Sequence, residues 1–418
     1  MKKTIHLLCC ILILASVGVA QPTLINCNNQ RYDTEVFPNV TINSDITYGS
    51  NFDSHGSSTT LTMDVYTATG DTASNRPLII WAHGGSFIGG TKNDVDVVAL
   101  SNHFAKRGYV CASINYRLGI LPNQASATQG VYRAVQDMRA AIRFFRKDAA
   151  TTNSYKINPN MVFAGGSSAG AFTALHLAYM DQPSELPVAI DTMLLGGIEG
   201  NSGNPGYPSH VNAVINLCGA LGDTSWMHVG DVPVCSMHGT NDIIVPYATD
   251  LLYLFGSIPI LIVNGSYSLS QYANATGISN AMYTYYGGQH VPYVNNVAYM
   301  DTTVRFVSNF LYSYMGCTPA DPNPLPNTFM PVSTQDGNPV LNDLAIYPNP
   351  AVERVTVQWN NSIIQKLELK DITGRLIKTI HVNSSSPVSI DRGGLSSGLY
   401  FLKIFSHEKT MTAKICFR

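Results

Sequence analysis

Residues 161–170, Met-Val-Phe-Ala-Gly-Gly-Ser-Ser-Ala-Gly, constrain the fold more than any other stretch of the chain. The apolar start of this segment indicates a buried strand, and the apolar residues after Gly170 indicate a helix. Residues 166–170 fit the pattern Gly-x-Ser-x-Gly, in which small neighbours permit a turn so tight that the central serine stands exposed. The segment therefore predicts a strand, a sharp turn and a helix, with Ser168 as the candidate nucleophile.

Continuous apolar runs recur on both sides of this segment. They lie at residues 77–83, 109–115, 213–218, 232–238 and 281–286. Strands without polar alternation are buried on both faces, as in parallel sheets covered by helices. Residues 97–107, 135–147 and 297–314 have helical features, and the second helix is amphipathic, with Arg139, Arg143, Arg146 and Lys147 on its polar side. We predict an α/β fold with a mostly parallel sheet covered by helices on both faces.

A serine hydroxyl needs a general base and a group that orients the base, and both must lie within hydrogen-bond reach of Ser168. Asp242 follows the strand at 232–238, and His290 follows the strand at 281–286. The order serine, acid, histidine, each just past a strand end, occurs in one class of serine hydrolases. We predict that His290 is the base and that Asp242 orients it, and we keep Asp223 as the alternative acid.

Two other histidines and two glycines also lie at strand ends. His83 and His238 are interpreted as structural histidines, because buried strand ends commonly carry satisfied polar side chains. Gly84 and Gly85 follow the strand at 77–83. Their N–H groups, together with that of Ala169 after the nucleophile, are the predicted oxyanion hole.

Together these features resemble the α/β-hydrolase fold, in particular its carboxylesterase and hormone-sensitive-lipase-like branch. The resemblance covers about residues 59–314 and rests on residues 83–87, 115–118, 137–146, 166–170 and 238–246 and on His290. It implies an α/β-hydrolase that forms an acyl-enzyme on Ser168 and needs no metal or organic cofactor. One departure is Ser86, which replaces the third glycine of the His-Gly-Gly-Gly pattern and is expected to narrow the acyl side.

The two ends of the chain carry different signals. Residues 1–20 combine two lysines, an apolar run and small residues, which is typical of a signal peptide. Residues 21–317 form the predicted hydrolase domain, residues 318–340 a Pro-rich linker, and residues 341–418 a small β-sandwich built from short alternating runs. Residues 346–351, 371–375 and 398–404 resemble the C-terminal sorting domain of type IX secretion cargo. That resemblance implies export through the type IX machinery, removal of the tail and, often, attachment to the cell surface.

The charge and the cysteine content of the chain restrict which binding partners and metals are expected. The formal net charge is -2 and 12% of residues are charged, which argues against nucleic acid and against a basic membrane patch. The cysteines after the signal peptide have no metal-binding spacing. Export permits disulfides, and the suspected pairs are Cys27 with Cys317 and Cys218 with Cys235, with free buried thiols as the alternative for the second pair.

The predicted function is that of a secreted serine hydrolase acting on carboxylic esters. The polar, Gly-rich segment 196–210 occupies the position where relatives often carry a cap, and it predicts an open, wettable cleft. Such a cleft favours short-acyl esters and acetyl or feruloyl esters on polysaccharides. The alternatives are a serine peptidase of the same fold and a non-catalytic adhesion or binding protein.

Overall fold

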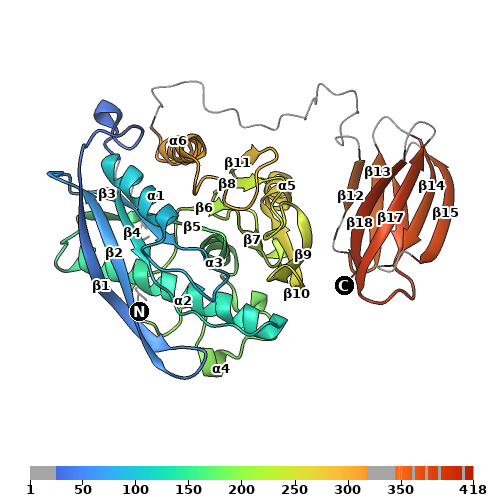
Figure 1. Ribbon diagram of the computed structural model, residues 1–418, viewed down its shortest axis with the longest axis horizontal. Helices are drawn as coiled ribbons and strands as arrows, with labels where there is room; N and C mark the ends of the chain where they lie inside the picture. Colours follow the sequence, from blue (N-terminus) through green and yellow to red (C-terminus); the bar gives the residue numbers. More distant parts are fainter. Residues whose placement is uncertain are drawn as a thin grey trace, which may run out of the picture. The chain divides into compact units, whose positions relative to one another are not determined.

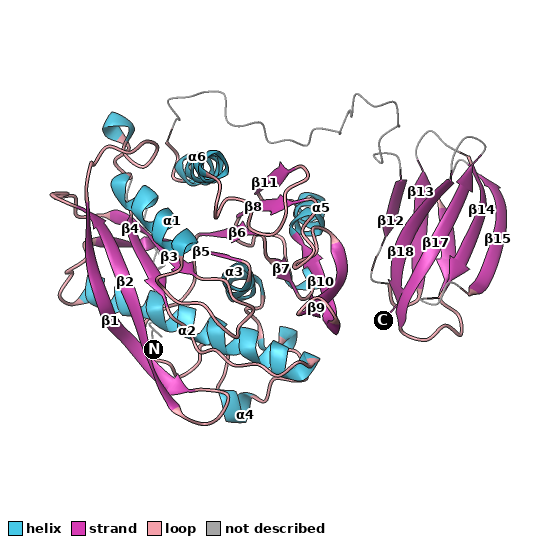
Figure 2. Cartoon of the chain, viewed as in Figure 1, coloured by secondary structure: helices cyan, strands magenta, loops and turns pink. Residues whose placement is uncertain are grey.

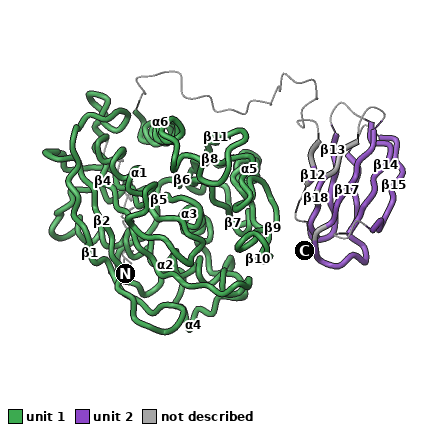
Figure 3. The backbone as a smooth tube through the Cα atoms, in the orientation of Figure 1, with its two compact units in different colours: residues 1–328 green, residues 329–418 purple. Residues whose placement is uncertain are grey.

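The computed structural model describes residues 25–317 and, with short gaps, residues 344–417. The chain divides into two compact units, residues 1–328 and 329–418 (Figure 3). The predicted signal peptide at 1–20 lies outside the described residues, and so does the Pro-rich linker at 318–340. Both assignments, with the domain boundaries that depend on them, stay predictions.

An eight-stranded sheet forms the centre of the first unit (Figure 1). Its strand order is β1-β2-β4-β3-β5-β6-β8-β11, and all neighbours from β4 to β11 are parallel, whereas β1 and β2 form an antiparallel edge. Every residue of β3 is buried, which explains its lack of polar alternation. The bounds are β1 Val40–Phe52, β2 Ser58–Ala68, β3 Arg76–Ala82, β4 Val110–Ile114, β5 Ile157–Ser167, β6 Ala213–Leu217, β8 Val234–Gly239 and β11 Asn280–Tyr285.

Helices cover both faces of this sheet (Figure 2). Helices α2 (Gln124–Ala150), α3 (Ala169–Tyr179) and α5 (Ser266–Thr276) share one apolar core with the sheet. Helices α1 (Val95–Lys106) and α6 (Val297–Tyr314) share a second core on the other face. The predicted α/β-hydrolase architecture is confirmed, although α2 begins well before the predicted position.

A second, three-stranded sheet was not predicted. It consists of β7 (Ala220–Leu221), β9 (Thr249–Leu254) and β10 (Ile258–Gly265) in the order β7-β10-β9. Strands β9 and β10 form an antiparallel hairpin, whose residues also line the apolar pocket described below. The remaining short elements are η1 (Asn28–Gln30), η2 (Pro183–Glu185), α4 (Thr192–Leu195) and η3 (Thr224–Trp226).

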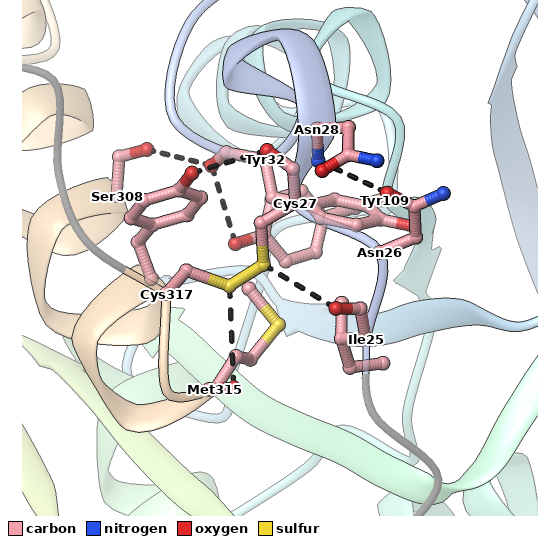
Figure 4. Close-up of a disulfide and its surroundings, with 10 residues drawn as sticks. Ile25, Asn26, Cys27, Asn28, Tyr32, Tyr109, Ser308, Met315 and Cys317 are labelled. Carbon is pink, nitrogen blue, oxygen red and sulfur yellow. Dashed lines mark hydrogen bonds between the residues drawn. A yellow bond between two sulfur atoms is a disulfide. The ribbon is translucent and has the colours of Figure 1, made fainter.

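A disulfide joins Cys27 to Cys317 and confirms the first suspected pair (Figure 4). Near it, the hydroxyl of Tyr312 donates to the carbonyl of Cys27 at 3.3 Å. The second pair is wrong, because Cys218 and Cys235 are free and buried. In the parallel register of β6 and β8, Cys235 lies opposite Ile215. Cys218 lies three residues further along, a displacement of about 10 Å that no disulfide spans.

The second unit is an antiparallel β-sandwich. One sheet has the order β12-β13-β16 and the other β15-β14-β17-β18. Inward residues such as Val355, Leu367 and Leu402 from both sheets form one apolar core, while their neighbours along each strand are more exposed. The bounds are β12 Leu344–Tyr347, β13 Arg354–Trp359, β14 Ile364–Lys370, β15 Leu376–Ser384, β16 Val388–Asp391, β17 Gly398–Ser406 and β18 Thr410–Phe417.

Candidate active site

Ser168 lies on a strained turn between β5 and α3, with φ 53° and ψ -118°. The turn packs against the end of β3. A Cβ atom at Gly166 would lie 2.5 Å from the carbonyl oxygen of Ala82, and one at Gly170 would lie 2.0 Å from it. Only glycine fits at these two positions, which explains why the pattern Gly-x-Ser-x-Gly predicts this geometry.

The structure brings Ser168, His290 and Asp242 together from three strand ends. Ser168 Oγ is 2.9 Å from His290 Nε2, and His290 Nδ1 is 2.7 Å from Asp242 Oδ2. The neighbouring Ser167 instead bonds the hydroxyl of Tyr293 at 2.6 Å. Asp223, the alternative acid, accepts the N–H of Ser225 and caps η3. The hydrogen bonds therefore favour Asp242 over Asp223 as the partner of His290.

Asp242 is held by four hydrogen bonds. Its Oδ1 accepts the backbone N–H groups of Ile244 and Val245, each at 2.9 Å. Its Oδ2 accepts His290 Nδ1–H and also His238 Nε2–H at 3.1 Å. Burial alone would raise the pKa of Asp242, but the bonds from His238 and His290 outweigh it and hold the pKa well below its ordinary value. The carboxylate therefore stays ionised in mildly acidic solution.

The loop after β3 lies directly against Ser168. A Cβ atom at Gly84 would be 3.4 Å from Ser168 Cβ. His83 Nδ1–H donates to the carbonyl of Gly84 at 2.7 Å, and the hydroxyl of Tyr116 donates to the carbonyl of His83 at 2.8 Å. These bonds fix the backbone of the loop. His83 is therefore bonded to the loop through Nδ1, whereas its buried Nε2 has no hydrogen-bond partner among the described residues.

The predicted oxyanion donors come from two places. Gly84 and Gly85 lie at the start of the loop after β3, and Ala169 lies at the start of α3. Ala169 is the first residue of α3, so its N–H has no acceptor within the helix. Gly85, Ser86 and Phe87 follow Gly84 with φ values of 105°, 55° and 60°. Left-handed conformations at two successive non-glycine residues cost free energy and commonly mark functional loops. Ser86 and Phe87 both line the pocket.

A buried ion pair between Arg117 and Asp137 supports the loop after β3. Arg117 Nη2 lies 2.8 Å from Asp137 Oδ1, with side-chain exposures of 3% and 0%. The backbone N–H of Arg117 also donates to Asp137 Oδ2 at 2.8 Å. Because Tyr116 precedes Arg117 and bonds the loop, this pair ties the loop to α2. Tyr116 and Arg117, which belong to the segment 115–118 on which the family resemblance partly rests, therefore help to fix the loop after β3.

A deep apolar pocket opens next to Ser168. Its walls come from the loop after β3, the first half of α2, α3, the segment after Met180 and the β9–β10 hairpin. They include the side chains of Phe87, Ile120, Val131, Tyr132, Phe172, Trp226, Leu252, Tyr253 and Leu261. Neither His290 nor Asp242 lines this pocket.

The predicted wettable cleft is wrong, because segment 196–210 does not line the pocket. It lies on the polar side of α2, where Arg143 donates to the carbonyl of Gly203 at 2.9 Å and Arg146 to that of Pro208 at 2.8 Å. Arg139 donates to Ser209 at 2.8 Å. All three arginines are buried. The polar segment thus covers the arginines and leaves the pocket to apolar residues.

One group of metal-type donors occurs among the described residues, formed by Cys218, His238 and Asp242 within 4.8 Å of one another. His238 and Asp242 are already bonded to each other, and burial raises the pKa of the Cys218 thiol. The group is therefore interpreted as a hydrogen-bonded cluster, with a protonated thiol, and not as a set of metal ligands. Within the described ranges, no helix has the length and hydropathy needed to span a membrane.

Comparisons with known proteins agree with this architecture. Residues 63–228 match the BD-FAE family, and residues 345–418 match the secretion system C-terminal sorting domain. A mouse protein, carboxylesterase 3B, is 33% identical over 113 residues, which are 26% of this chain. The match spans only 19% of that relative's length.

Solved structures that are similar to this chain include esterase 2 of Thermogutta terrifontis phosphorylated by paraoxon. It is 20% identical, with a TM-score of 0.47 over 68% of this chain and 97% of that one. A truncated carbohydrate esterase from gut microbiota is 20% identical, with a TM-score of 0.45 over 68% and 98% of the two chains. Residues 63–228 thus match a family of esterase-like α/β-hydrolases, and residues 345–418 match a sorting domain, which indicates type IX export to the outside of the cell or its surface.

Proposed function

We propose that this protein hydrolyses carboxylic esters through an acyl-enzyme formed on Ser168. The observation that carries the proposal is the hydrogen-bonded relay from Ser168 through His290 to Asp242 beside an apolar pocket. His290 Nε2 takes the Ser168 proton as the hydroxyl attacks the ester carbonyl, and ionised Asp242 stabilises the resulting imidazolium. The N–H groups of Gly84, Gly85 and Ala169 receive the developing oxyanion.

The position of His290 indicates which half of the ester enters the pocket. His290 must hand its proton to the departing alcohol, so the alcohol lies beside its ring. The ring is 18% exposed and does not line the pocket, whereas Ser168, Ser86 and Ala169 do. This supports an acyl group held in the apolar pocket and an alcohol held on the solvent side. A hydrophilic alcohol, such as a sugar hydroxyl of a polysaccharide, suits that side.

Within the predicted substrate range, the pocket favours bulky apolar acyl groups. Aromatic walls such as Phe87, Phe172 and Trp226 suit a planar acyl group such as feruloyl, and a lone acetyl group would leave most of the apolar surface uncovered. We therefore rank feruloyl-type and medium-chain esters above acetyl esters. The peptidase alternative has no observation in its favour, because the pocket offers no charged group to bind a peptide terminus.

The test is an acyl series of p-nitrophenyl esters from acetate to palmitate, run beside methyl ferulate, acetylated xylan and a peptide p-nitroanilide. We expect kcat/KM to rise from acetate to a medium chain. Val131→Phe narrows the pocket and should lower the octanoate-to-acetate ratio of kcat/KM. Val229→Phe is the matched control, because Val229 is 83% exposed and outside the pocket. Highest kcat/KM on acetate, with no change in Val131→Phe, would contradict the acyl assignment.

A further inference from the structure

His238 lies at the end of β8, four residues before Asp242, and is fully buried. Its Nε2 faces two oxygens, Asp242 Oδ2 at 3.1 Å and the carbonyl of Val245 at 3.2 Å. Both oxygens can only accept a hydrogen bond, because the carboxylate is ionised. Nε2 therefore carries a hydrogen and donates it toward Asp242.

The other side of the ring fixes this tautomer. His238 Nδ1 is 2.7 Å from Ser266 Oγ, and Ser266 Oγ accepts Asn216 Nδ2–H at 3.0 Å. The amide of Asn216 is oriented by its Oδ1, which accepts the N–H of Gly219 at 2.9 Å. The hydroxyl of Ser266 thus donates to Nδ1, and a neutral ring satisfies every one of these contacts. In this series of hydrogen bonds, Asn216 donates to Ser266, Ser266 donates to His238, and His238 donates to Asp242.

We propose that His238 is a positioning residue of the catalytic relay, an inference that rests on the esterase function proposed above. Its N–H shares Asp242 Oδ2 with His290, so it holds this oxygen in line with the His290 ring and withdraws negative charge from it. The titratable groups against His238 are Asp242, the Tyr247 ring at 5.8 Å and the nearby Cys218 thiol.

The test compares His238→Leu with His238→Gln on p-nitrophenyl butyrate. Leucine removes the N–H donor and no longer holds Asp242 Oδ2 in line with the His290 ring, and a small misplacement of this kind corresponds to roughly a tenfold to hundredfold fall in kcat. KM should change little, because His238 does not line the pocket. The acid limb of the kcat/KM profile reports His290, and it should move to higher pH, because a carboxylate with fewer donors holds the imidazolium more strongly.

Glutamine keeps an N–H donor for Asp242 and an oxygen that accepts from Ser266. It should restore most of kcat and the wild-type acid limb. Met237→Ala removes buried side-chain volume from the same strand, and it should lower Tm without moving that limb. Wild-type kcat and pH profile in His238→Leu, or equal losses in both His238 variants, would overturn the proposal. Undiminished hydrolysis by Ser168→Ala would instead contradict the proposed function itself.

Discussion

Replacing Asp242 with asparagine should place His290 in the wrong tautomer. Asp242 Oδ1 accepts the N–H groups of Ile244 and Val245, so the amide oxygen of asparagine must keep this position. The amide NH₂ then takes the place of Oδ2 and faces both His290 Nδ1 and His238 Nε2. His238 Nε2–H can still donate to the carbonyl of Val245, but His290 Nδ1–H faces only the NH₂ donor, so His290 moves its hydrogen to Nε2. That nitrogen can then no longer accept the proton of Ser168.

The size of the expected fall in kcat follows from the loss of His290 as the general base. In a serine protease, the corresponding substitution leaves the geometry intact and lowers kcat about 10⁴-fold. This factor corresponds to about 5.5 kcal/mol of transition-state stabilisation. We expect a similar loss for Asp242→Asn with p-nitrophenyl butyrate. KM should stay near its wild-type value, because Asp242 does not line the pocket.

The assay is steady-state hydrolysis between pH 5 and pH 10, with folding of each variant checked by circular dichroism. Asp223→Asn is the matched control, because Asp223 caps η3 by accepting the N–H of Ser225. Its kcat should stay within a few-fold of wild type. A kcat for Asp242→Asn above a tenth of the wild-type value would refute the tautomer argument. Loss of activity in Asp223→Asn alone would move the acid to Asp223.

Three further predictions concern the nucleophile, the disulfide and the tail. Ser168→Ala should lose several orders of magnitude in kcat with p-nitrophenyl butyrate, whereas Ser167→Ala should not, because Ser167 bonds Tyr293. Reduction of the Cys27–Cys317 disulfide, which encloses 290 residues, should lower the unfolding free energy of the first unit by about 2–5 kcal/mol in a urea titration; an unchanged midpoint would contradict this. A chain ending at Pro322 should keep its specific activity on p-nitrophenyl butyrate, and a loss with the fold intact would assign the tail a role in substrate binding.

The sheet and the relay could be predicted from sequence because parallel strands bring their carboxyl ends to one edge. Each strand is a continuous apolar run, so its end is visible, and the residue just past it is a candidate. This rule predicts Ser168, Asp242 and His290, and their side chains are hydrogen-bonded in the structure. Gly166 and Gly170 were visible for a related reason, since the close approach to β3 admits only glycine.

The polar contacts could not be predicted, because sequence spacing does not say what covers a polar side chain. Arg143 on α2 has the spacing of a solvent-exposed residue, yet segment 196–210 covers it and supplies carbonyl acceptors. His238 carries no local signal that separates a structural role from contact with Asp242. Cys235 lies in β8 and Cys218 directly follows the neighbouring β6, but only the register of β6 and β8 shows that they are too far apart.

The pocket also shows that sequence predicts residues at strand ends better than it predicts which segments pack together. Its walls come from segments that are ordinary apolar runs in the sequence, including the β9–β10 hairpin, which two such runs around Gly256 and Ser257 could have indicated. The hairpin belongs to the small β7-β10-β9 sheet, whereas the residues of the relay follow strands of the large sheet. Substitutions at Leu252 or Leu261 can therefore reshape the apolar pocket while the hydrogen bonds among Ser168, His290 and Asp242 stay in place. Under the proposed function, acyl selectivity and catalytic competence would be set by separate parts of the same unit, and the motifs that identify the three hydrogen-bonded residues contain little information about the pocket.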